Sequence, residues 1–377
     1  MNGSLYLERR GVMSVSKLDI ATLVSELDTE DMLGYLRNFP DDLANQWSIE
    51  EPQRDMPERV ICLGMGGSAA AGDFLASLAC MHGTAAVTTH RGYDVPSWGG
   101  AAGAGLYFST SYSGNTEETL SATILAMEHG NFVNMISSGG TLAEMDGQES
   151  PLGGKGQHVS VPGGQPPRSA FGHLFGALSR IAYSYQIIPA LMNWVENGLV
   201  ERLRQVVSEY DFINNPDSPA ISIARTLIGR EVGIVSDHNL ACAGTRFTNQ
   251  LNENGGIFAR PTTLPEMNHN EIIAWTQPEA KEKQALLLLT WDGMHERVAE
   301  RVNWMTEAVD VDVVWNLHCE GESLLEAMLY SCIAMDWISC AVAFLRGKDP
   351  SSIGAIRELK EHLNKSPIDL IELMFDD

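Results

Sequence analysis

The feature that most constrains the fold is an apolar run that stops at a glycine and leads directly into a helical pattern. Residues 59–64 (RVICLG) have the composition of a short buried strand. The glycine-rich segment 64–72 (GMGGSAAAG) follows it and opens a helix predicted over 68–82. Similar elements continue, with predicted strands at 85–89, 105–109, 132–136 and 157–161 and predicted helices at 115–129 and 169–187. This alternation is typical of a parallel sheet covered by helices on both faces.

The second half of the chain repeats this order of elements. Strands are predicted at 231–235, 285–289 and 311–314, and helices at 241–253, 293–309 and 322–346. A helix is also expected over 17–38 and another over 353–363, and the turn-rich segment 206–220 (VVSEYDFINNPDSPA) separates the halves. The sequence therefore predicts an α/β chain divided into residues 1–205, 206–350 and 351–377.

Charge and cysteine usage exclude several classes of protein. The 377 residues carry 25 basic and 49 acidic side chains, a net charge of −24 that opposes binding to nucleic acid or to anionic membranes. The six cysteines form no C-x-x-C pair, and they indicate reduced core residues in a cytoplasmic protein. No H-x-H or H-E-x-x-H motif occurs, and neither an export signal nor a membrane span is expected.

The glycine-rich turn is a candidate anion site, because free N–H groups and the helix dipole meet at the start of a helix. A dinucleotide fold is the competing interpretation. It requires an acidic residue at the end of the second strand, which here reads Thr88-Thr89-His90-Arg91. A tight turn that binds no ligand is the other alternative.

A second loop carries hydroxyls at the start of the next helix. In 109–118 (STSYSGNTEE) the side chains of Ser111, Ser113 and Thr116 cluster around Gly114, whereas a simple helix cap needs one such residue. Hydroxyls together with backbone N–H groups suit a phosphate monoester. The two loops follow neighbouring strands and should face one crevice at the sheet's carboxyl edge. We therefore predict a phosphate site made of Gly67, Ser68, Ser111, Ser113 and Thr116.

Several motifs resemble the bifunctional phosphoglucose/phosphomannose isomerase family, whose members have two sugar-isomerase (SIS) domains. They are 64–68 (GMGGS), 91–93 (RGY), 111–120 (SYSGNTEETL), 167–172 (PRSAFG), 252–254 (NEN) and 264–271 (LPEMNHNE). The resemblance runs from about residue 59 to 365 in the family's order. It implies two SIS domains, each a flavodoxin-like parallel sheet flanked by helices.

The resemblance also implies roles for four residues. Glu253 is similar to the family's base for a cis-enediol reaction, and Arg168 to the arginine that stabilises the enediolate. His269 corresponds to a histidine that reaches the partner subunit's site and assists ring opening, and Lys360 to a C-terminal lysine that joins it. Without the family, a solvated carboxylate, a loop-capping histidine and a surface lysine are the alternatives.

The implied activity is metal-independent interconversion of glucose 6-phosphate or mannose 6-phosphate with fructose 6-phosphate. It needs no cofactor, and the expected partner is a second copy of the chain, in a homodimer with sites at the subunit interface. After the base, the family commonly has Asn-Ala-Lys, whereas this chain has Asn254-Gly255-Gly256 and lacks the lysine. A non-catalytic sugar-phosphate sensor with the same fold, or an isomerase for another phosphosugar, stays open as an alternative.

Overall fold

The computed structural model describes residues 20–45, 47, 57–99, 105–188 and 197–365. These residues form two compact units. Unit 1 contains residues 20–37 and 201–352, and unit 2 contains residues 38–200 and 353–365 within the described ranges. Each unit is built on a parallel sheet flanked by helices, so the predicted α/β class is confirmed. The predicted domain boundaries at 205/206 and 350/351 stay a prediction.

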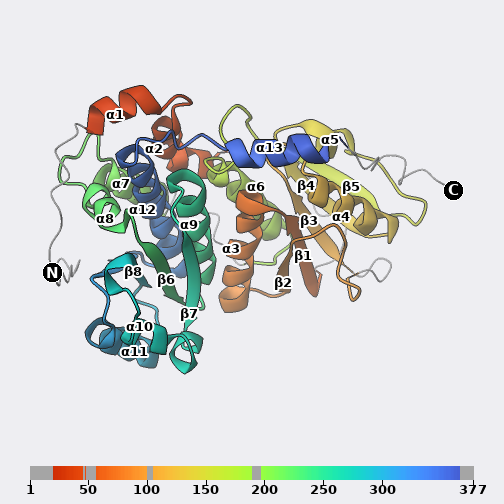
Figure 1. The fold of residues 1–377 in the computed structure, drawn as a ribbon. Helices are drawn as coiled ribbons and strands as arrows, with labels where there is room; N and C mark the ends of the chain where they lie inside the picture. Colours follow the sequence, from red (N-terminus) through yellow and green to blue (C-terminus); the bar gives the residue numbers. More distant parts are fainter. Residues whose placement is uncertain (1–19, 46, 48–56, 100–104, 189–196, 366–377) are drawn as a thin grey trace. The chain divides into compact units, whose positions relative to one another are not determined.

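Unit 2 holds a five-stranded parallel sheet in the order β2-β1-β3-β4-β5 (Figure 1). Its strands are β1 (Arg59–Gly64), β2 (Ala86–His90), β3 (Leu106–Thr110), β4 (Phe132–Ser137) and β5 (Lys155–Ser160). Its helices are α3 (Gly66–His82), α4 (Glu117–Glu128), α5 (Gly140–Glu144), α6 (Phe171–Ser184) and α13 (Gly354–Leu363). The strands and the long helices of this list were predicted from the sequence, with ends that differ by a few residues.

Alternate side chains along the strands of unit 2 reach opposite faces of the sheet, as the period of a strand requires. Leu63 and Tyr107 join the core under α4 and α5. Phe108 packs against Tyr185 at the end of α6, and Gly72 lets α3 approach Cys62. In β1, β3 and β4 nearly every residue is buried, which explains why these strands read as continuous apolar runs, whereas the edge strands β2 and β5 are partly exposed.

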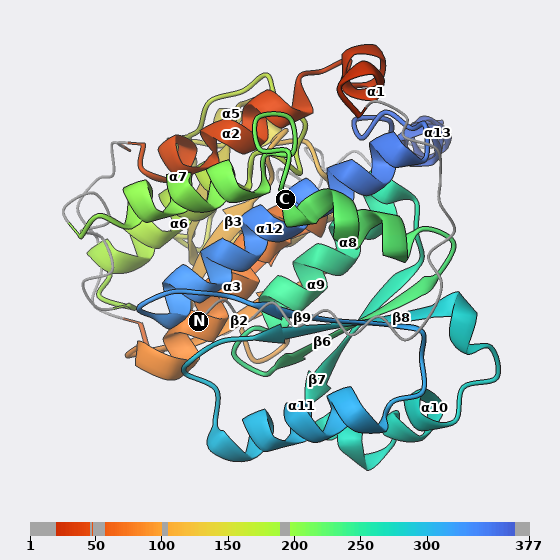
Figure 2. The ribbon, with the colours of Figure 1, turned by 90° about the vertical axis from the view of Figure 1, so that its left-hand side faces the viewer.

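Unit 1 holds a four-stranded parallel sheet in the order β7-β6-β8-β9. Figure 2 shows α10 and α11 on one face of this sheet and α8, α9 and α12 on the other. The strands are β6 (Glu231–Asp237), β7 (Ala259–Leu264), β8 (Gln284–Thr290) and β9 (Val313–His318). The helices are α7 (Leu199–Tyr210, in this unit from residue 201), α8 (Pro219–Leu227), α9 (Ala241–Gln250), η1 (Leu251–Gly255), η2 (Glu266–His269), α10 (Ile272–Thr276), η3 (Lys281–Lys283), α11 (Glu296–Ala308) and α12 (Leu324–Leu345).

The single helix predicted over 17–38 is wrong where the structure describes it. The chain forms α1 (Ile20–Leu27) and α2 (Met32–Leu43), and residues 17–19 lie outside the described ranges. The carboxylate of Asp28 accepts the N–H groups of Met32 at 2.6 Å and Leu33 at 3.1 Å, so it caps the start of α2. Asp31 has a left-handed backbone with φ of 54°, which breaks the helical path.

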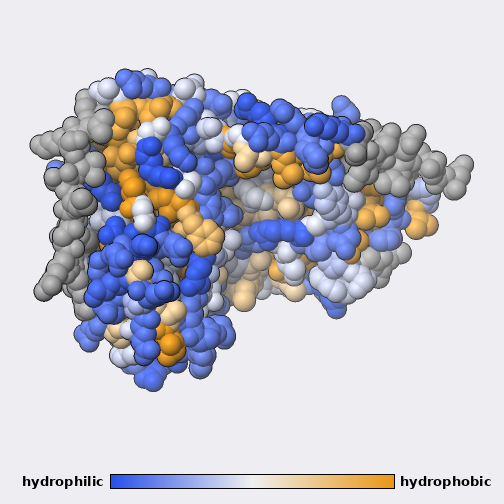
Figure 3. Space-filling view, viewed as in Figure 1, coloured by the Kyte–Doolittle hydropathy of each residue, from blue (hydrophilic) through white to orange (hydrophobic). Residues whose placement is uncertain are grey.

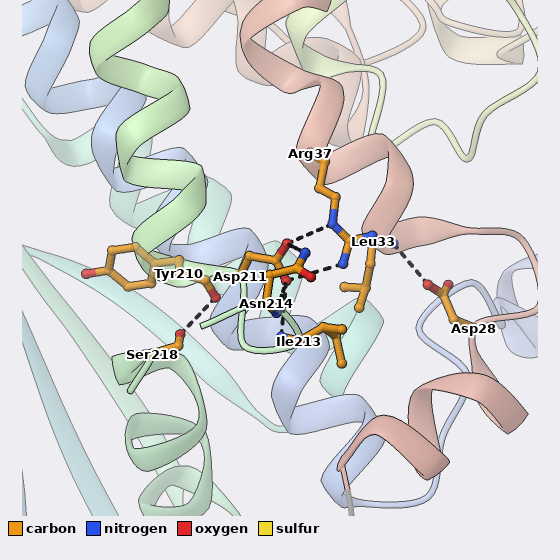
Figure 4. A network of polar contacts seen from close by, with 8 residues as sticks. All are labelled: Asp28, Leu33, Arg37, Tyr210, Asp211, Ile213, Asn214 and Ser218. Atoms are coloured by element: carbon orange, nitrogen blue, oxygen red, sulfur yellow. Dashed lines mark hydrogen bonds and ion pairs between the residues drawn. The ribbon is translucent and has the colours of Figure 1, made fainter. Parts of the chain in front are cut away.

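The turn-rich segment 206–220 is more ordered than a linker. Helix α7 continues to Tyr210 and α8 begins at Pro219, so only 211–218 is non-helical. Figure 4 shows Arg37, from α2, pointing at Asp211 in this turn. Its Nε lies 2.8 Å from Oδ2, and Asp211 is buried. Burial raises the pKa of Asp211, but Arg37 and Asn214 outweigh burial and the pKa is lowered overall.

Helix α12 is the core helix of unit 1. By length and composition alone Leu324–Leu345 could cross a membrane, but 94% of its most apolar window is buried within the structure, as in the core helix of a water-soluble protein. On the face drawn in Figure 3, hydrophilic residues (blue) cover much of the surface, in keeping with the excess of carboxylates. The sequence is rich in glycine and other small residues at 96–105 (PSWGGAAGAG), where we predict a flexible loop, and residues 100–104 of this stretch lie outside the described residues.

Candidate active site

The carboxyl ends of β1 and β3 form the centre of the predicted phosphate site in unit 2. After β1 the chain continues to β2 on one side of the sheet, and after β3 it continues to β4 on the other side. Open α/β sheets bind ligands at such a switch point in strand order. Gly64 brings the two strand ends together, because a Cβ there would lie 2.9 Å from the carbonyl oxygen of Thr110. Gly67 and Ser68 stand in the first turn of α3, which Met65 does not cap with its side chain.

The serine loop after β3 is joined to this turn. The backbone N–H of Tyr112 donates to Ser68 Oγ at 3.2 Å. The Ser111 and Thr116 hydroxyl oxygens lie 2.9 Å apart, so Thr116 bonds across the loop and does not cap α4 with its side chain. Ser113 is exposed, and its Oγ accepts the N–H of Asn115 at 3.3 Å. Ser68, Ser111 and Thr116 are therefore brought together, with Ser113 at the loop's exposed tip.

A third loop, 137–141, supports the serine loop from β4. Gly114 has φ of 68°, and a Cβ on it would lie 1.8 Å from the carbonyl oxygen of Gly139, so only glycine fits. Ser138 donates both its N–H, at 2.9 Å, and its Oγ hydroxyl, at 2.7 Å, to the carbonyl of Tyr112. The backbone that carries the hydroxyls of the serine loop is thus held in place by its contacts with loop 137–141.

Arg168 lies beside the start of α3. Its Cα would be 3.6 Å from a Cβ on Gly67, and its side chain is buried, with 5% of the residue exposed. The segment that carries it is tied to the serine loop, since the N–H of Gln165 donates to the Tyr112 hydroxyl at 3.2 Å. Tyr112 and Gln165 were not singled out from the sequence. Their contacts span 53 residues, and no local pattern marks them.

Five residues after Arg168, the buried His173 pairs with the half-buried carboxylate of Asp42. His173 Nε2, on α6, is 3.4 Å from Asp42 Oδ1, on the last turn of α2. Burial raises the pKa of Asp42 to about 6, against a lowering by the Gln165 side chain, and burial lowers the pKa of His173. Burial thus disfavours the charged form of His173, and the contact joins α2 and α6 through polar groups.

In unit 1, Glu253 stands in the middle of η1, a π-helical turn that continues α9. The predicted helix 241–253 is thus α9 plus this wider turn, a form that is rare and frequent at functional sites. Glu253 is partly exposed, between two anchored asparagines. Asn252 Oδ1 accepts the N–H of Ala259 at 2.9 Å, and Asn254 Nδ2 donates to Ser339 Oγ of α12 at 2.9 Å.

The face of α9 that leads into η1 is fixed by a buried polar seam. Arg246 pairs with Asp336 of α12, with Nη1 2.6 Å from Oδ1, and Gln250 Nε2 donates to the same Oδ1 at 2.6 Å. Together with Asn254, these residues recur every four positions along α9 and η1. The rotation of the turn that bears Glu253 is therefore set by α12.

His269 and Glu253 lie at opposite ends of β7. Asn252 binds Ala259, the first residue of the strand, whereas His269 ends η2, which follows the last residue, Leu264. The six strand residues are joined by five steps of about 3.3 Å, which separates the two ends by roughly 17 Å. His269 is exposed. Within one copy of unit 1, the two residues are thus not brought together.

Lys360 lies on α13 of unit 2, and none of the residues of this helix is buried. The exposed helix also carries Ile356 and Leu359. Among the residues that the structure describes, no group of three or more His, Cys, Asp or Glu side chains is arranged to hold a metal ion.

The chain was compared with known proteins. Residues 216–363 match the family model of the bacterial phospho-glucose isomerase C-terminal SIS domain. A bifunctional phosphoglucose/phosphomannose isomerase from Aquifex aeolicus is 32% identical over 330 residues, covering 85% of this chain and 96% of that protein. The enzyme of the same name from Thermoplasma acidophilum is 27% identical, covering 81% of this chain and 89% of that protein.

The fold has relatives among solved structures. The C-terminal domain of glucosamine-fructose-6-phosphate aminotransferase from Francisella tularensis superposes with a TM-score of 0.63 at 14% identity, covering 85% of this chain and 98% of that one. At this identity the likeness concerns the fold alone. The sequence match is closer, and the chain belongs to the bifunctional phosphoglucose/phosphomannose isomerase family.

Proposed function

We propose that this protein interconverts glucose 6-phosphate and mannose 6-phosphate with fructose 6-phosphate. The observation that carries the proposal is the set of neutral hydroxyls at the switch point of unit 2. Ser68 Oγ accepts the N–H of Tyr112, the residue after Ser111, and the Ser111 hydroxyl bonds that of Thr116. Such a group can surround a phosphate monoester without a cluster of cations. The names of the related enzymes supply the sugar.

In the proposed site, the phosphate is bound by the N–H of Gly67 and by the hydroxyls of Ser68, Ser111, Ser113 and Thr116. The positive end of the α3 dipole adds to the attraction. The phosphate anchors the sugar and leaves C1 and C2 for proton transfer. Arg168 is assigned to the developing charge of the enediolate, since a guanidinium stabilises an oxyanion best when it is buried and fixed.

Glu253 is the proposed base. Its carboxylate takes the proton from C2 of the open-chain aldose, the C2–H electron pair forms the enediolate double bond, and the resulting carboxylic acid returns a proton to C1. The C1=O1 π pair moves onto O1, which takes the proton of the O2 hydroxyl. As C1 accepts the returned proton, the electron pair left on O2 forms the ketose carbonyl, and O1 is the new hydroxyl. Ring opening precedes this, with His269 and Lys360 moving a proton from the anomeric hydroxyl to the ring oxygen.

The separation of Glu253 and His269 along β7 supports a homodimer with shared sites. If both act on one sugar, the histidine must come from a second copy, and a symmetric pair then has two such sites. Mixing inactive Glu253→Gln and His269→Asn subunits should restore activity. Half of the pairs are then mixed and one of their two sites is intact, so about a quarter of wild-type activity returns. No recovery after subunit exchange would remove the shared site.

The reaction as proposed uses carboxylate, imidazole and ammonium groups, and it requires no metal and no cofactor. We also place the protein in the cytoplasm, where sugar phosphates are found and where its free cysteines, most of them buried, stay reduced.

The proposal is tested by adding fructose 6-phosphate to protein that has been dialysed against a chelator, and resolving the products by NMR. Glucose 6-phosphate and mannose 6-phosphate should both accumulate. If fructose 6-phosphate stays unchanged but its signals broaden on binding, the protein is a sensor and the proposal fails. Activity that appears only after zinc is added back would overturn the metal-independent mechanism.

A further inference from the structure

The turn that carries Glu253 is held at its carboxyl end by a residue far away in the sequence. Arg346, directly after α12, donates through Nη1 to the carbonyl oxygen of Gly255 and, at 2.6 Å, to that of Gly256. The last carbonyls of a helix have no partner within the helix, and a guanidinium suits them in both charge and hydrogen bonding. Arg346 thus closes the turn two residues after the proposed base.

Arg346 is itself well placed to act as a fixed clamp. It is the C-cap of α12, and its N–H donates to the carbonyls of Val342 and Ala343 at 3.1 Å each. Helix α12 is almost wholly buried, so the Arg346 backbone is anchored in the core while the residue as a whole is exposed. A substitution of its side chain should therefore leave the core of unit 1 intact.

The clamp also accounts for the glycines that follow Glu253. Gly256 has φ of 57°, and a Cβ there would lie 2.7 Å from Lys348 Nζ and 3.1 Å from Arg346 Nη1. A Cβ on Gly255 would lie 2.9 Å from Val342 of α12. In this chain the cations beside the turn come from the end of α12, and they fill the space that a side chain at 256 would take.

We propose that Arg346 is a positioning residue for Glu253, and that it sets the carboxylate's place by fixing the carboxyl end of η1. The inference rests on the proposed function of Glu253. Misplacing a base by about 1 Å can lower a rate about 100-fold. A cap with a merely structural role would instead change the stability of the fold and leave the rate per folded molecule as it was.

The test compares Arg346→Met, which keeps the length of the stem and removes every donor, with Arg346→Lys. For Arg346→Met we expect kcat to fall about 10- to 100-fold, with KM and the melting temperature close to wild type. Arg346→Lys should lie in between, because the ammonium keeps the charge and loses the planar fork. Added guanidinium ion should restore part of the kcat of Arg346→Met. An unchanged kcat in Arg346→Met would overturn the proposal.

Arg230 provides a matched control in the same unit. Its Nη1 donates to the carbonyl of Thr226 at 2.7 Å, near the end of α8, so it also caps a helix. Arg230→Met should keep wild-type kcat. An equal loss of kcat in both variants would show a general effect of removing a cap and would contradict a specific role for Arg346.

Hydrogen exchange separates this inference from the function on which it rests. The backbone amides of 251–257 should exchange faster in Arg346→Met than in wild type, and those of α8 should not. This readout needs no turnover. Absent isomerisation by the wild-type protein would reject the proposed function, whereas unchanged exchange in Arg346→Met would reject the clamp in either case.

Discussion

The carboxyl edges of the two sheets have equivalent topology and opposite chemistry. In unit 2, the loops after β1 and β3 meet where the N–H of Tyr112 donates to the neutral hydroxyl of Ser68, and the Ser111 hydroxyl bonds that of Thr116 within the second loop. In unit 1, the loops after β6 and β8 meet through a buried carboxylate. Asp237 Oδ1 accepts the N–H of Leu240 at the start of α9, at 3.0 Å, and Oδ2 accepts the indole N–H of Trp291, also at 3.0 Å.

This difference shows that strand order determines where a ligand site can form, and that the side chains at that position determine which ligand it can bind. The strand orders β2-β1-β3-β4 and β7-β6-β8-β9 put a switch point in each unit. At the start of α9, however, the anion position is filled by the protein's own Asp237, which is 2% exposed. A phosphate would meet a like charge there, which is why the phosphate site that we propose lies in unit 2.

The largest expected effect separates chemistry from binding. Glu253→Gln should lower kcat by about 10²- to 10⁴-fold, the usual contribution of a general base, with little change in KM. Steady-state kinetics with fructose 6-phosphate measure both. Glu300→Gln, an exposed residue of α11 paired with Arg297, serves as the control and should keep full activity. A wild-type kcat for Glu253→Gln would remove Glu253 from the proposed mechanism.

The next effect concerns the hydroxyls of unit 2. Ser111→Ala or Thr116→Ala should raise KM about 10- to 100-fold, because a hydrogen bond to a charged group contributes about 1.5–3 kcal/mol. The control is Ser121→Ala, which removes a hydroxyl from α4, the helix that begins after Thr116. The Ser121 hydroxyl donates to the carbonyl of Tyr93, and its loss should leave KM unchanged. If Ser111→Ala and Thr116→Ala kept the wild-type KM, as Ser121→Ala should, the phosphate would bind elsewhere.

The corresponding change in unit 1 should affect stability and spare binding. Trp291→Phe leaves one oxygen of the buried Asp237 without its indole donor, at an expected cost of about 1–3 kcal/mol in the free energy of unfolding. KM should stay within about twofold of wild type. Trp304→Phe, at an exposed position on α11, is the control for losing an indole. A rise in KM like that of Ser111→Ala would break the distinction between the two sheet edges.

The smallest expected change is in the number of binding sites. Calorimetric titration of the Glu253→Gln variant with fructose 6-phosphate should give one site per chain, and adding Asp237→Asn should not change that number. Two sites per chain would show that the edge of unit 1 also accepts a phosphate.

The sequence predicted the elements whose signals are local. The strand at 59–64 and the helix after it stand out because a buried parallel strand is a continuous apolar run and the glycines mark its end. Strand β7 was not predicted, since Pro261 in its middle reads as a break. The structure tolerates this proline because β7 is the edge strand of its sheet.

The candidate site was predictable only in part. The loops that bear Ser68, Ser111 and Thr116 are marked by their own residues, and the sequence predicted them together. The contacts that hold them, such as the Gln165 N–H on the Tyr112 hydroxyl, come from distant segments. The same is true of Arg346, which reaches Gly255 across 91 positions. Whether two such residues meet depends on tertiary packing, which no local pattern encodes.

The central proposal is that the carboxylate of Glu253 moves a proton of a bound sugar phosphate. The most direct test follows fructose 6-phosphate by proton NMR in D₂O with the wild-type protein and with Glu253→Gln. The account predicts aldose products carrying solvent deuterium at C2 with the wild type, and binding without deuterium uptake with the variant. Deuterium at C2 at the wild-type rate in Glu253→Gln, or no deuterium in any product of the wild type, would contradict it.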